Sequence, residues 1–558
     1  MRVALSHLPT KLDEVYDEVL QRIYSQESHL ARLAEQTLSW ISYAFRPLTI
    51  RELQSALGVE PGDTTFDIDG IIEESVSISV CEGLITIDEE SRIIRLVHHT
   101  TQVYLECIRD SQFPSAEVDI ARICITYLSF DDFADGCCGP DWHGGGLFYK
   151  LQKYPLLRYA ATYLGYHTRG KPEAMLEYLI LDLLSHQAKV DSFFQAMDLI
   201  EGSHYGPYRP TRVPPISAAA FFDLRSIVQL LIEQGANLHS ADSNSYTALH
   251  HAVCNRHDSV ALIVLEHGAD PSSRAFREGS NNLNVVPIAL IIAIENADRS
   301  MAKLLLRYGA PLNTRDVNGF TALHEAVSKL DEDIVQLLLS SGADVDARSI
   351  KGSTPLMMAA RTGHTRVTDL LIKSQATVNI QDVAGGTALI YAAQRGHVAV
   401  TRLLLECGAD VHLQDGWGQP ALFGGARDGQ EAVILLLLAN EADATMQDHD
   451  GCTALMLAAD GGQESIVRLL IEKGANPHSR NVDGKTALFI AAEGERNSVV
   501  EALHELGADL HVKDSKGRLP HGTSERFAKY LNDLFEWNDV GGAAGSPINR
   551  DGIVMIRR

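Results

Sequence analysis

The sequence predicts a mostly α-helical protein in which a helical N-terminal region precedes a long α-solenoid. The solenoid is predicted because the second half of the chain repeats itself with a period of 33 residues. The N-terminal third lacks that period and shows amphipathic helical patterns followed by two short apolar runs. With 45% hydrophobic and 22% charged residues, the chain has the composition of a folded globular protein, and 558 residues suffice for several domains or one array.

The repeat is marked by Thr-Ala-Leu or Thr-Pro-Leu, which recurs at Thr247, Thr321, Thr354, Thr387, Thr453 and Thr486. A pair of small residues follows, as in Ala359-Ala360, and then come an LLL-like run, Gly-Ala-Asp or Gly-Ala-Asn, and Asp-x-x-Gly. This order resembles the ankyrin repeat, in which a turn, two antiparallel helices and a β-hairpin finger form one unit. Because one helix pair cannot bury its apolar face alone, stacked units would share a continuous core.

We expect nine such units, then a cap helix over residues 519–537 and a flexible tail over residues 538–558. The step from the second unit to the third is 41 residues, and the extra residues fall in the finger Pro271–Val286. This insertion is either a specific contact or an ordinary surface loop. The units open near Pro214, Thr247, Ile288, Thr321, Thr354, Thr387, Pro420, Thr453 and Thr486.

Weak points in the array are predicted where glycine is missing or misplaced. Glycine closes the second helix of most units in a left-handed conformation, but Gln375 and Glu441 stand there in two units. Each should cost about 1 kcal/mol if the backbone is kept. The unit that opens at Pro420 also carries Gly424 and Gly425 inside its first helix, at a cost of roughly 1 kcal/mol each relative to alanine. We therefore predict that this unit is the softest joint.

The resemblance to ankyrin repeats implies a binding surface on the concave face of the array, formed by finger tips and first helices. Aromatic and arginine side chains on such a face are the types that interface hot spots favour. The alternative is that these side chains pack against neighbouring fingers. The expected partner-binding residues are Tyr246, Phe320 and Trp417 in the fingers and Met358, Arg361, Tyr391, Gln394, Arg395 and Arg427 in the first helices.

Residues 1–110 show the order of elements of a winged helix. Amphipathic helices are predicted over Leu12–Tyr24 and His29–Ala44. Thr49 with Glu52 three residues later forms a capping box that opens a short helix. Two apolar runs, CEGLITID and RIIRLV, then predict a β-hairpin.

The stretch LVHHTTQVYLE follows that hairpin, and its two histidines suggest a metal or catalytic site. Neighbouring residues of a strand point to opposite faces, so His98 and His99 would be unable to chelate one ion together. Thr100 or Thr101 suits the start of a final helix. The stretch is therefore predicted to be a strand-to-helix corner.

A second resemblance rests on four segments: LPTKLDEVYDEVLQRI, FRPLTIREL, CEGLITID and RLVHHTTQVYLE. They resemble the winged helix that follows the NACHT ATPase in fungal NACHT–ankyrin receptors, relatives of NOD-like receptors, and a segment of GPI inositol-deacylases. Residues 111–212, with ARICITYLSFDDF and YPLLRYAATYLGYH, resemble the helical connector before the repeats at 213–518. The resemblance implies a NACHT domain ahead of LPTKLDEVY, where Met1 stands seven residues away, so we expect that domain to be absent.

Catalytic motifs do not emerge from the sequence. No phosphate loop is present, since Gly484-Lys485-Thr486 belongs to a finger and its repeat, and we expect no ATPase activity. The run His143-Gly144-Gly145-Gly146 lacks the GxSxG elbow of an esterase. Cys137, Cys138 and His143 lack a fourth zinc ligand. We expect no enzyme activity, metal ion or cofactor.

Charge and cysteine usage bound the partners and the compartment. The net charge is −25, and residues 1–110 carry 9 Lys/Arg against 19 Asp/Glu, a net of −10, which excludes DNA and anionic membranes as partners. Eight scattered cysteines fit a reducing compartment, so the cytoplasm or the nucleus is expected. No signal peptide or membrane span is evident.

These observations predict a non-enzymatic, monomeric scaffold or sensor that binds a protein partner of unknown identity on the concave ankyrin face. One alternative is a nuclear co-regulator that acts through a bound transcription factor. A second is a fragment of a larger NACHT–ankyrin receptor of the immune type.

Overall fold

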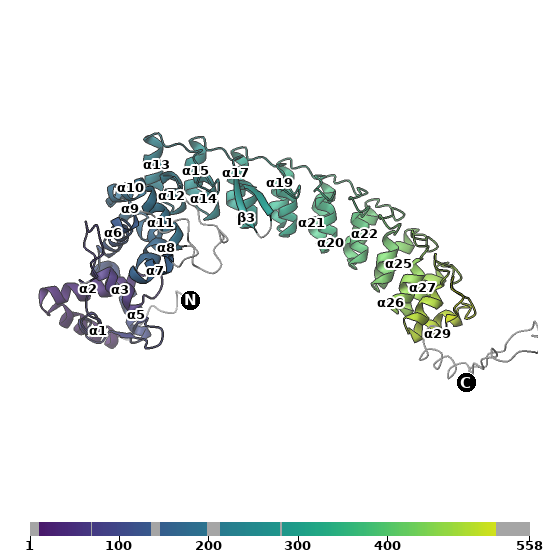
Figure 1. Cartoon of the computed structure of the whole chain (residues 1–558), viewed down its shortest axis with the longest axis horizontal. Coiled ribbons are helices and arrows are strands. Elements are labelled where there is room, and N and C mark those ends of the chain that lie inside the picture. The colour runs from purple at the N-terminus through teal and green to yellow at the C-terminus, as the bar shows by residue number, and fades with distance from the viewer. Residues whose placement is uncertain (1–9, 69, 135–145, 198–211, 280–281, 521–558) are drawn as a thin grey trace, which may run out of the picture. The chain divides into compact units, whose positions relative to one another are not determined.

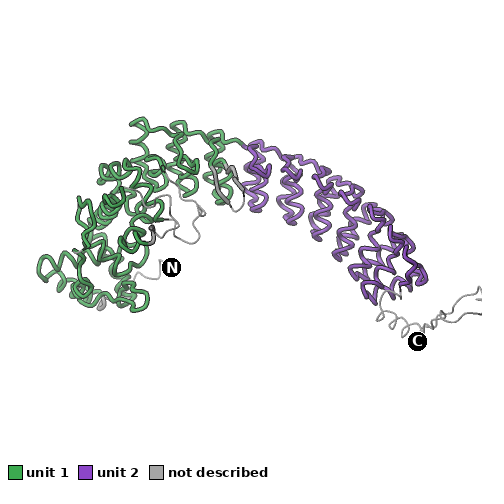
Figure 2. Tube along the Cα trace, in the orientation of Figure 1, with its two compact units in different colours: residues 1–311 green, residues 312–558 purple. Residues whose placement is uncertain are grey.

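The computed structural model describes residues 10–68, 70–134, 146–197, 212–279 and 282–520 (Figure 1). The chain divides into two compact units, residues 1–311 and 312–558, which are described separately here (Figure 2). Helices dominate both units, and the strands within the described ranges form two antiparallel sheets of two strands each. The predicted fold class, mostly α with a repeat solenoid, is confirmed. Across the same ranges, no helix combines the length and apolar character needed to cross a membrane.

The N-terminal module of the first unit has the order of elements predicted for a winged helix. In chain order these are α1 (Thr10–Tyr24), α2 (Ser28–Tyr43), α3 (Ile50–Leu57), α4 (Glu74–Ser79), β1 (Ile85–Ile87), β2 (Ile94–Leu96) and α5 (His99–Gln112). Strands β1 and β2 pair with Ile85 opposite Leu96, and Thr49 bridges to Ile93. The hairpin is thereby joined to the start of α3.

Local capping predictions in this module have mixed outcomes. The capping box at α3 is confirmed, because the Glu52 amide donates to the Thr49 hydroxyl at 3.3 Å and the Thr49 amide donates to the Glu52 carboxylate at 2.8 Å. The prediction that Thr100 or Thr101 caps α5 is wrong. His98 is the N-cap, and its Nδ1 accepts from the Thr100 amide at 3.2 Å.

The two threonines instead tie α5 to α1. The Tyr16 hydroxyl lies 2.6 Å from the Thr100 hydroxyl and accepts a hydrogen bond from Thr101 at 3.2 Å. The placement of the histidines in a strand is also wrong, since β2 ends at Leu96 and α5 begins at His99. The stretch is a strand-to-helix corner, as predicted, but its histidines belong to the helix start.

The connector that follows consists mostly of helices in the residues that the structure describes. It comprises α6 (Ala116–Leu128), the 3₁₀ turn η1 (Asp131–Phe133), α7 (Gly146–Lys153), α8 (Leu157–Thr168), α9 (Lys171–Met175), α10 (Glu177–Ser185) and α11 (Gln187–Met197). Its core is aromatic: the ring of Tyr127 lies 5.0 Å from Phe130, and that of Phe133 lies 5.0 Å from Tyr154. All four rings are buried, which gives the connector a packed interior of its own.

The repeats of the first unit follow the connector. Their helices are α12 (Pro215–Phe221), α13 (Arg225–Glu233), α14 (Ala248–Cys254), α15 (Asp258–Glu266), α16 (Ala289–Glu295) and α17 (Arg299–Arg307). The insertion predicted at Pro271–Val286 forms a hairpin of β3 (Arg274–Gly279) and β4 (Asn282–Ile288). It is thus an elongated finger rather than an irregular loop.

The second unit continues with helix pairs of nearly constant length. They are α18 (Ala322–Ser328), α19 (Glu332–Ser340), α20 (Pro355–Thr362), α21 (Thr365–Lys373), α22 (Ala388–Gln394), α23 (Val398–Glu406), α24 (Ala421–Arg427), α25 (Glu431–Ala439), α26 (Ala454–Gly461), α27 (Glu464–Glu472), α28 (Ala487–Glu493) and α29 (Asn497–Glu505). The repeated Thr acts as N-cap, as at Thr354, whose hydroxyl accepts from the Met357 amide at 3.3 Å. The predicted cap helix and tail lie almost entirely outside the described residues.

The predicted weak points keep the repeat backbone. Gln375 and Glu441 have φ values of 68° and 66°, so both adopt the left-handed conformation that glycine adopts elsewhere. Gly424 and Gly425 remain inside α24. A Cβ at Gly424 would lie 3.1 Å from the Gln394 backbone, so this glycine also allows α24 to approach α22. Its helix-propensity cost therefore accompanies a packing role that the sequence did not reveal.

Candidate protein-interaction surface

Most fingers of the second unit are turns held by an aspartate side chain. The Asp382 carboxylate accepts from the amides of Ala384 and Gly386, both at 2.9 Å. The Asp415 carboxylate accepts in the same way from Trp417 at 3.0 Å and from the residue two further on at 2.9 Å. A conformation fixed by two backbone hydrogen bonds presents the finger side chains at fixed positions.

Neighbouring fingers are joined by backbone hydrogen bonds. The Ile350 amide donates to the carbonyl of the preceding finger at 2.8 Å, and the Val383 amide donates to the Lys351 carbonyl at 2.9 Å. The His449 amide donates to the Trp417 carbonyl at 3.0 Å. Equivalent finger side chains therefore form a row with one member per repeat.

An exposed apolar row lies on these fingers. Four of its side chains directly follow the finger Asp or the residue that replaces it, and Trp417 stands one residue later, at positions where a solvated turn would favour polar residues. The members are Val317, Ile350, Val383, Trp417 and Val482, with exposed fractions from 39% to 78%. Of these, the sequence-based prediction named only Trp417. The signal that would have found the others is the recurrence of Val or Ile directly after the first finger residue.

The first helices contribute Met358 and Tyr391 at equivalent positions, and both side chains are half-buried. The Tyr391 hydroxyl donates to the Asp382 carboxylate. Burial, together with this hydrogen bond, raises the pKa of Tyr391 to about 12. Its phenol therefore stays neutral, and its ring edge is held at the base of the finger.

Three arginines are exposed along the same helices. Arg361 and Arg427 occupy equivalent places at the ends of α20 and α24, and Arg395 directly follows α22. Within the described ranges, no carboxylate lies within ion-pair distance of any of the three. The Arg427 guanidinium donates to the neutral Gln419 amide oxygen at 2.9 Å.

The remaining predicted residues differ in exposure. Gln394 is exposed at the end of α22. Phe320 is half-buried, with its ring 5.2 Å from His324. Tyr246, in the first unit, is only 6% exposed and packs 5.6 Å from the ring of His250. Because the Tyr246 ring belongs to the core, the expectation that it binds a partner is not carried forward.

We call the exposed fingers and first helices of residues 316–427 the finger–helix surface. The predicted residues that it brings together in the second unit are Phe320, Met358, Arg361, Tyr391, Gln394, Arg395, Trp417 and Arg427.

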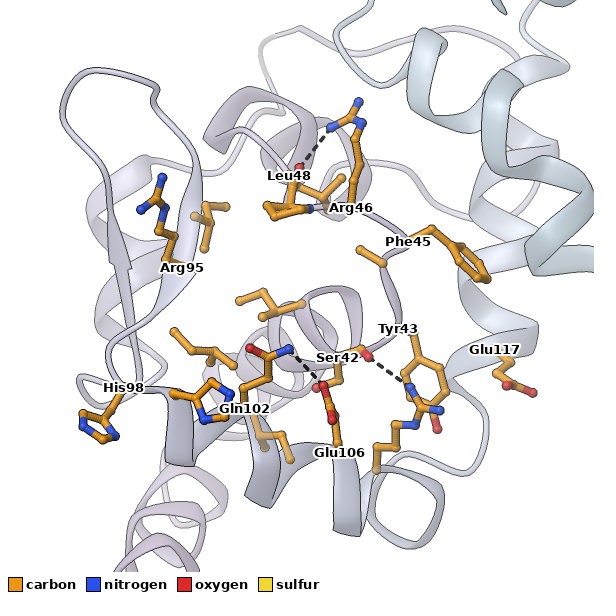
Figure 3. Close-up of a pocket in the computed structure, with 18 residues that line it drawn as sticks. Ser42, Tyr43, Phe45, Arg46, Leu48, Arg95, His98, Gln102, Glu106 and Glu117 are labelled. Carbon is orange, nitrogen blue, oxygen red and sulfur yellow. Dashed lines mark hydrogen bonds between the residues drawn. The ribbon is translucent and has the colours of Figure 1, made fainter. Parts of the chain in front are cut away.

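A cavity of about 630 Å³ lies in the N-terminal module (Figure 3). Part of LVHHTTQVYLE lines one side of it, including His98 and Gln102. Two of the arginines that line it have partners within the module: Arg46 pairs with Glu52, and the Arg109 guanidinium lies 4.9 Å from the centre of the Tyr43 ring. The cavity thus offers mixed polarity without a set of converging free charges.

The metal-site and esterase-like motifs considered in the sequence give no candidate site in the described residues. The residues that the structure describes contain no group of three or more His, Cys, Asp or Glu side chains placed to hold a metal ion. The candidate cluster Cys137, Cys138 and His143 lies outside the described residues, as does most of the glycine run beginning at His143.

Helix pairs with fingers, stacked at a constant period, define an α-solenoid built for presenting a surface. A family model described as ankyrin repeats (three copies) matches residues 186–275, 279–349, 345–415 and 422–514, together more than half of the chain. The chain belongs to the ankyrin-repeat family. A second model, the winged helix domain of GPI inositol-deacylase, matches residues 22–121. The predicted ankyrin repeats and winged helix are confirmed, whereas the fungal NACHT–ankyrin type stays a prediction.

Similar proteins share only parts of their length with this chain. The B-cell lymphoma 3 protein homolog of Mus musculus is 31% identical over 103 residues, which are 18% of this chain and 21% of that protein. Ankyrin repeat and SOCS box protein 6 of Mus musculus is 31% identical over 133 residues, 23% of this chain and 30% of that protein. Glycerophosphocholine phosphodiesterase gde1 of Schizosaccharomyces pombe is 36% identical over 120 residues, 21% of this chain and 10% of that protein.

Among solved structures, the human ASB11 ankyrin repeat domain is 26% identical to this chain. The match covers 37% of this chain and 92% of that one, with a TM-score of 0.34. The chain therefore spans less than a third of each curated relative named above.

Proposed function

We propose that this chain is a non-enzymatic scaffold that binds a protein partner on its finger–helix surface. The observation that carries the proposal is that Arg361, Arg395 and Arg427 are exposed and have no carboxylate partner among the described residues, on the same finger–helix surface as the exposed ring of Trp417. Arginine and tryptophan are enriched among the residues that dominate binding energy at protein interfaces, and an arginine without an internal ion pair loses no such pair when it binds a partner. The ankyrin-repeat family membership supports the same role.

The remaining parts of the chain have proposed supporting roles. We divide it into a winged-helix module (1–110), a helical connector (111–212) and about nine repeats (213–518), and the first two would act as a packing or docking unit. The proposed site of action is the cytoplasm or the nucleus, as a monomer and without direct contact to nucleic acid. Microscopy of a tagged chain distinguishes the two compartments, and a strictly cytoplasmic signal removes the nuclear co-regulator alternative.

A second candidate function is part of a NACHT–ankyrin receptor. The observation that favours it is the GPI inositol-deacylase type of winged helix at residues 22–121, ahead of the repeats and separated from them by the helical connector. The upstream genomic reading frame tests it. A phosphate-loop sequence in frame supports a receptor, and a stop codon without such a sequence contradicts it.

The experiment for the scaffold proposal compares partners retained by the wild-type chain and by single variants. Trp417→Ala and Tyr391→Ala should lose at least one partner, as quantified by mass spectrometry after affinity purification. The matched control is Tyr178→Ala, since Tyr178 is a 78% exposed aromatic on α10, away from the finger–helix surface in the sequence. If both variants keep every partner at wild-type level, the proposed surface is wrong.

A further inference from the structure

At one position of the first helices in the second unit, some repeats carry a charge that is paired within the chain, and others carry a charge without an ion-pair partner. In the repeat of α28, Glu493 accepts from Lys485 at 2.6 Å and from Arg518 at 3.3 Å, so its charge is neutralised within the chain. The equivalent helix position in the repeats of α20 and α24 is arginine, at Arg361 and Arg427. Neither has a carboxylate partner in the described part of the chain.

The finger carboxylates of these repeats are occupied by hydrogen bonds within the chain. Asp382 accepts two backbone amides and the Tyr391 hydroxyl, and Asp415 accepts two backbone amides. Asp428 is exposed next to Arg427, and Asp460 takes the equivalent position in the following repeat. Arg361, Arg395 and Arg427 thus form a positive stretch that extends over three consecutive repeats and ends before Asp460. In a chain of net charge −25, such a stretch is a local attractor for anionic groups.

The distance between repeats limits the shape of the partner. Packed helices lie about 8–10 Å apart, so equivalent positions recur at roughly that spacing along the stack. Arg361 and Arg427 are equivalent and two repeats apart, and Arg395 stands one residue past the equivalent position in the repeat between them. A β-strand presents one face every second residue, or about 6.6 Å, which does not match. A polyproline II segment presents one face every third residue, or about 9.3 Å, and this distance matches the spacing of the repeats.

We propose that the finger–helix surface binds an extended, polyproline-II-like acidic segment of a partner protein, with carboxylates at every third residue facing Arg361, Arg395 and Arg427. The intervening apolar or proline residues lie against Met358 and Trp417, since polyproline II segments dock on exposed aromatic and apolar surfaces. This inference rests on the proposed function and adds the chemistry of the partner.

The test uses a fluorescein-labelled peptide of four Glu-Leu-Pro triplets and the full chain, with binding followed by fluorescence anisotropy. Two comparison peptides have the same length: one has the glutamates grouped together, and one has lysine for glutamate. The triplet peptide should bind best, and added salt should weaken its binding. The combined variant Arg361→Glu, Arg395→Glu and Arg427→Glu should weaken it at least about 10-fold, given the modest worth of each exposed pair.

Arg402→Glu is the matched control, because Arg402 is an exposed arginine on the second helix of its repeat, and it should leave the affinity unchanged. Circular dichroism melting confirms that the variants fold. Equal affinity for the triplet and grouped peptides, or equal affinity of the wild type and the combined variant, overturns the inference, as does absence of binding. If partners are still lost in Trp417→Ala and Tyr391→Ala, the scaffold function stands and only the partner chemistry is wrong.

Discussion

The central and C-terminal repeats of the second unit share one backbone but differ in how they treat charge. The central repeats, which open at Thr354, Thr387 and Pro420, leave Arg361, Arg395 and Arg427 at the ends of their first helices without carboxylate partners among the described residues. The C-terminal repeats, which open at Thr453 and Thr486, pair Glu493 with two cations of the chain itself. Stacking of the repeats thus determines the arrangement of the helices, whereas the exposed residue at the end of each first helix can differ in charge from one repeat to the next.

The largest expected effects concern the shared core, and they test whether the two regions are one scaffold. Leu404 and Leu470 occupy equivalent positions on α23 and α27, and both are fully buried. Replacement of either by alanine should cost about 2–5 kcal/mol of local stability, because each leaves a similar cavity. Hydrogen exchange of the affected helix pair measures the cost.

The control for this pair is Leu435→Ala, since Leu435 is 45% exposed and should lose far less stability. A large effect at Leu404 with a negligible one at Leu470 would show that the two regions do not share a common core.

The next largest effect is a difference in local stability between the central and the C-terminal repeats. The pair α24 and α25 carries Gly424, Gly425 and the left-handed Glu441, whose costs sum to roughly 3 kcal/mol if additive. Its backbone amides should therefore exchange faster than those of α26 and α27. Equal protection of the two pairs would contradict the prediction and would show that close packing offsets the glycines.

The variant Gly424→Ala tests whether helix propensity or close packing determines the stability of this helix pair. Helix propensity alone predicts a gain of about 1 kcal/mol, but the new Cβ would lie 3.1 Å from the Gln394 backbone. Since a backbone atom cannot move aside as a side-chain end can, we expect a net loss of stability.

The repeat period, the Thr caps and the apolar runs were sufficient to predict the fold of the array, because each is a local requirement met many times over. Features that depend on a single side-chain contact were predicted less well from the sequence. The N-cap at His98 depends on its ring reaching the Thr100 amide, and the burial of Tyr246 depends on two histidines of its own repeat. The exposed Val and Ile of the finger row escaped notice because apolar residues are normally assigned to the core.

A smaller effect concerns the left-handed positions. Gln375→Gly and Glu441→Gly should each stabilise their repeat by about 1 kcal/mol, since both side chains now sit at positive φ. The reciprocal change Gly474→Gln, at a φ of 96° with open space around it, should destabilise by a similar amount. Urea unfolding measures all three, and a loss of stability in the two glycine variants would contradict the backbone argument.

The smallest effect tests the charge difference itself. Glu493→Gln removes the carboxylate that Lys485 and Arg518 share, and these partly exposed pairs are together worth about 1 kcal/mol or less to stability. Thermal unfolding should therefore change little. The variant should nevertheless bind the labelled Glu-Leu-Pro peptide more tightly, because it removes one negative charge from the first-helix positions and frees Lys485, while Arg518 stays paired with Asp514. The control Glu501→Gln, on the second helix of the same repeat, removes one negative charge away from the first helices and should bind as the wild type does. Tighter binding by both variants alike would mean that net charge, rather than the unpaired row on the first helices, attracts the peptide.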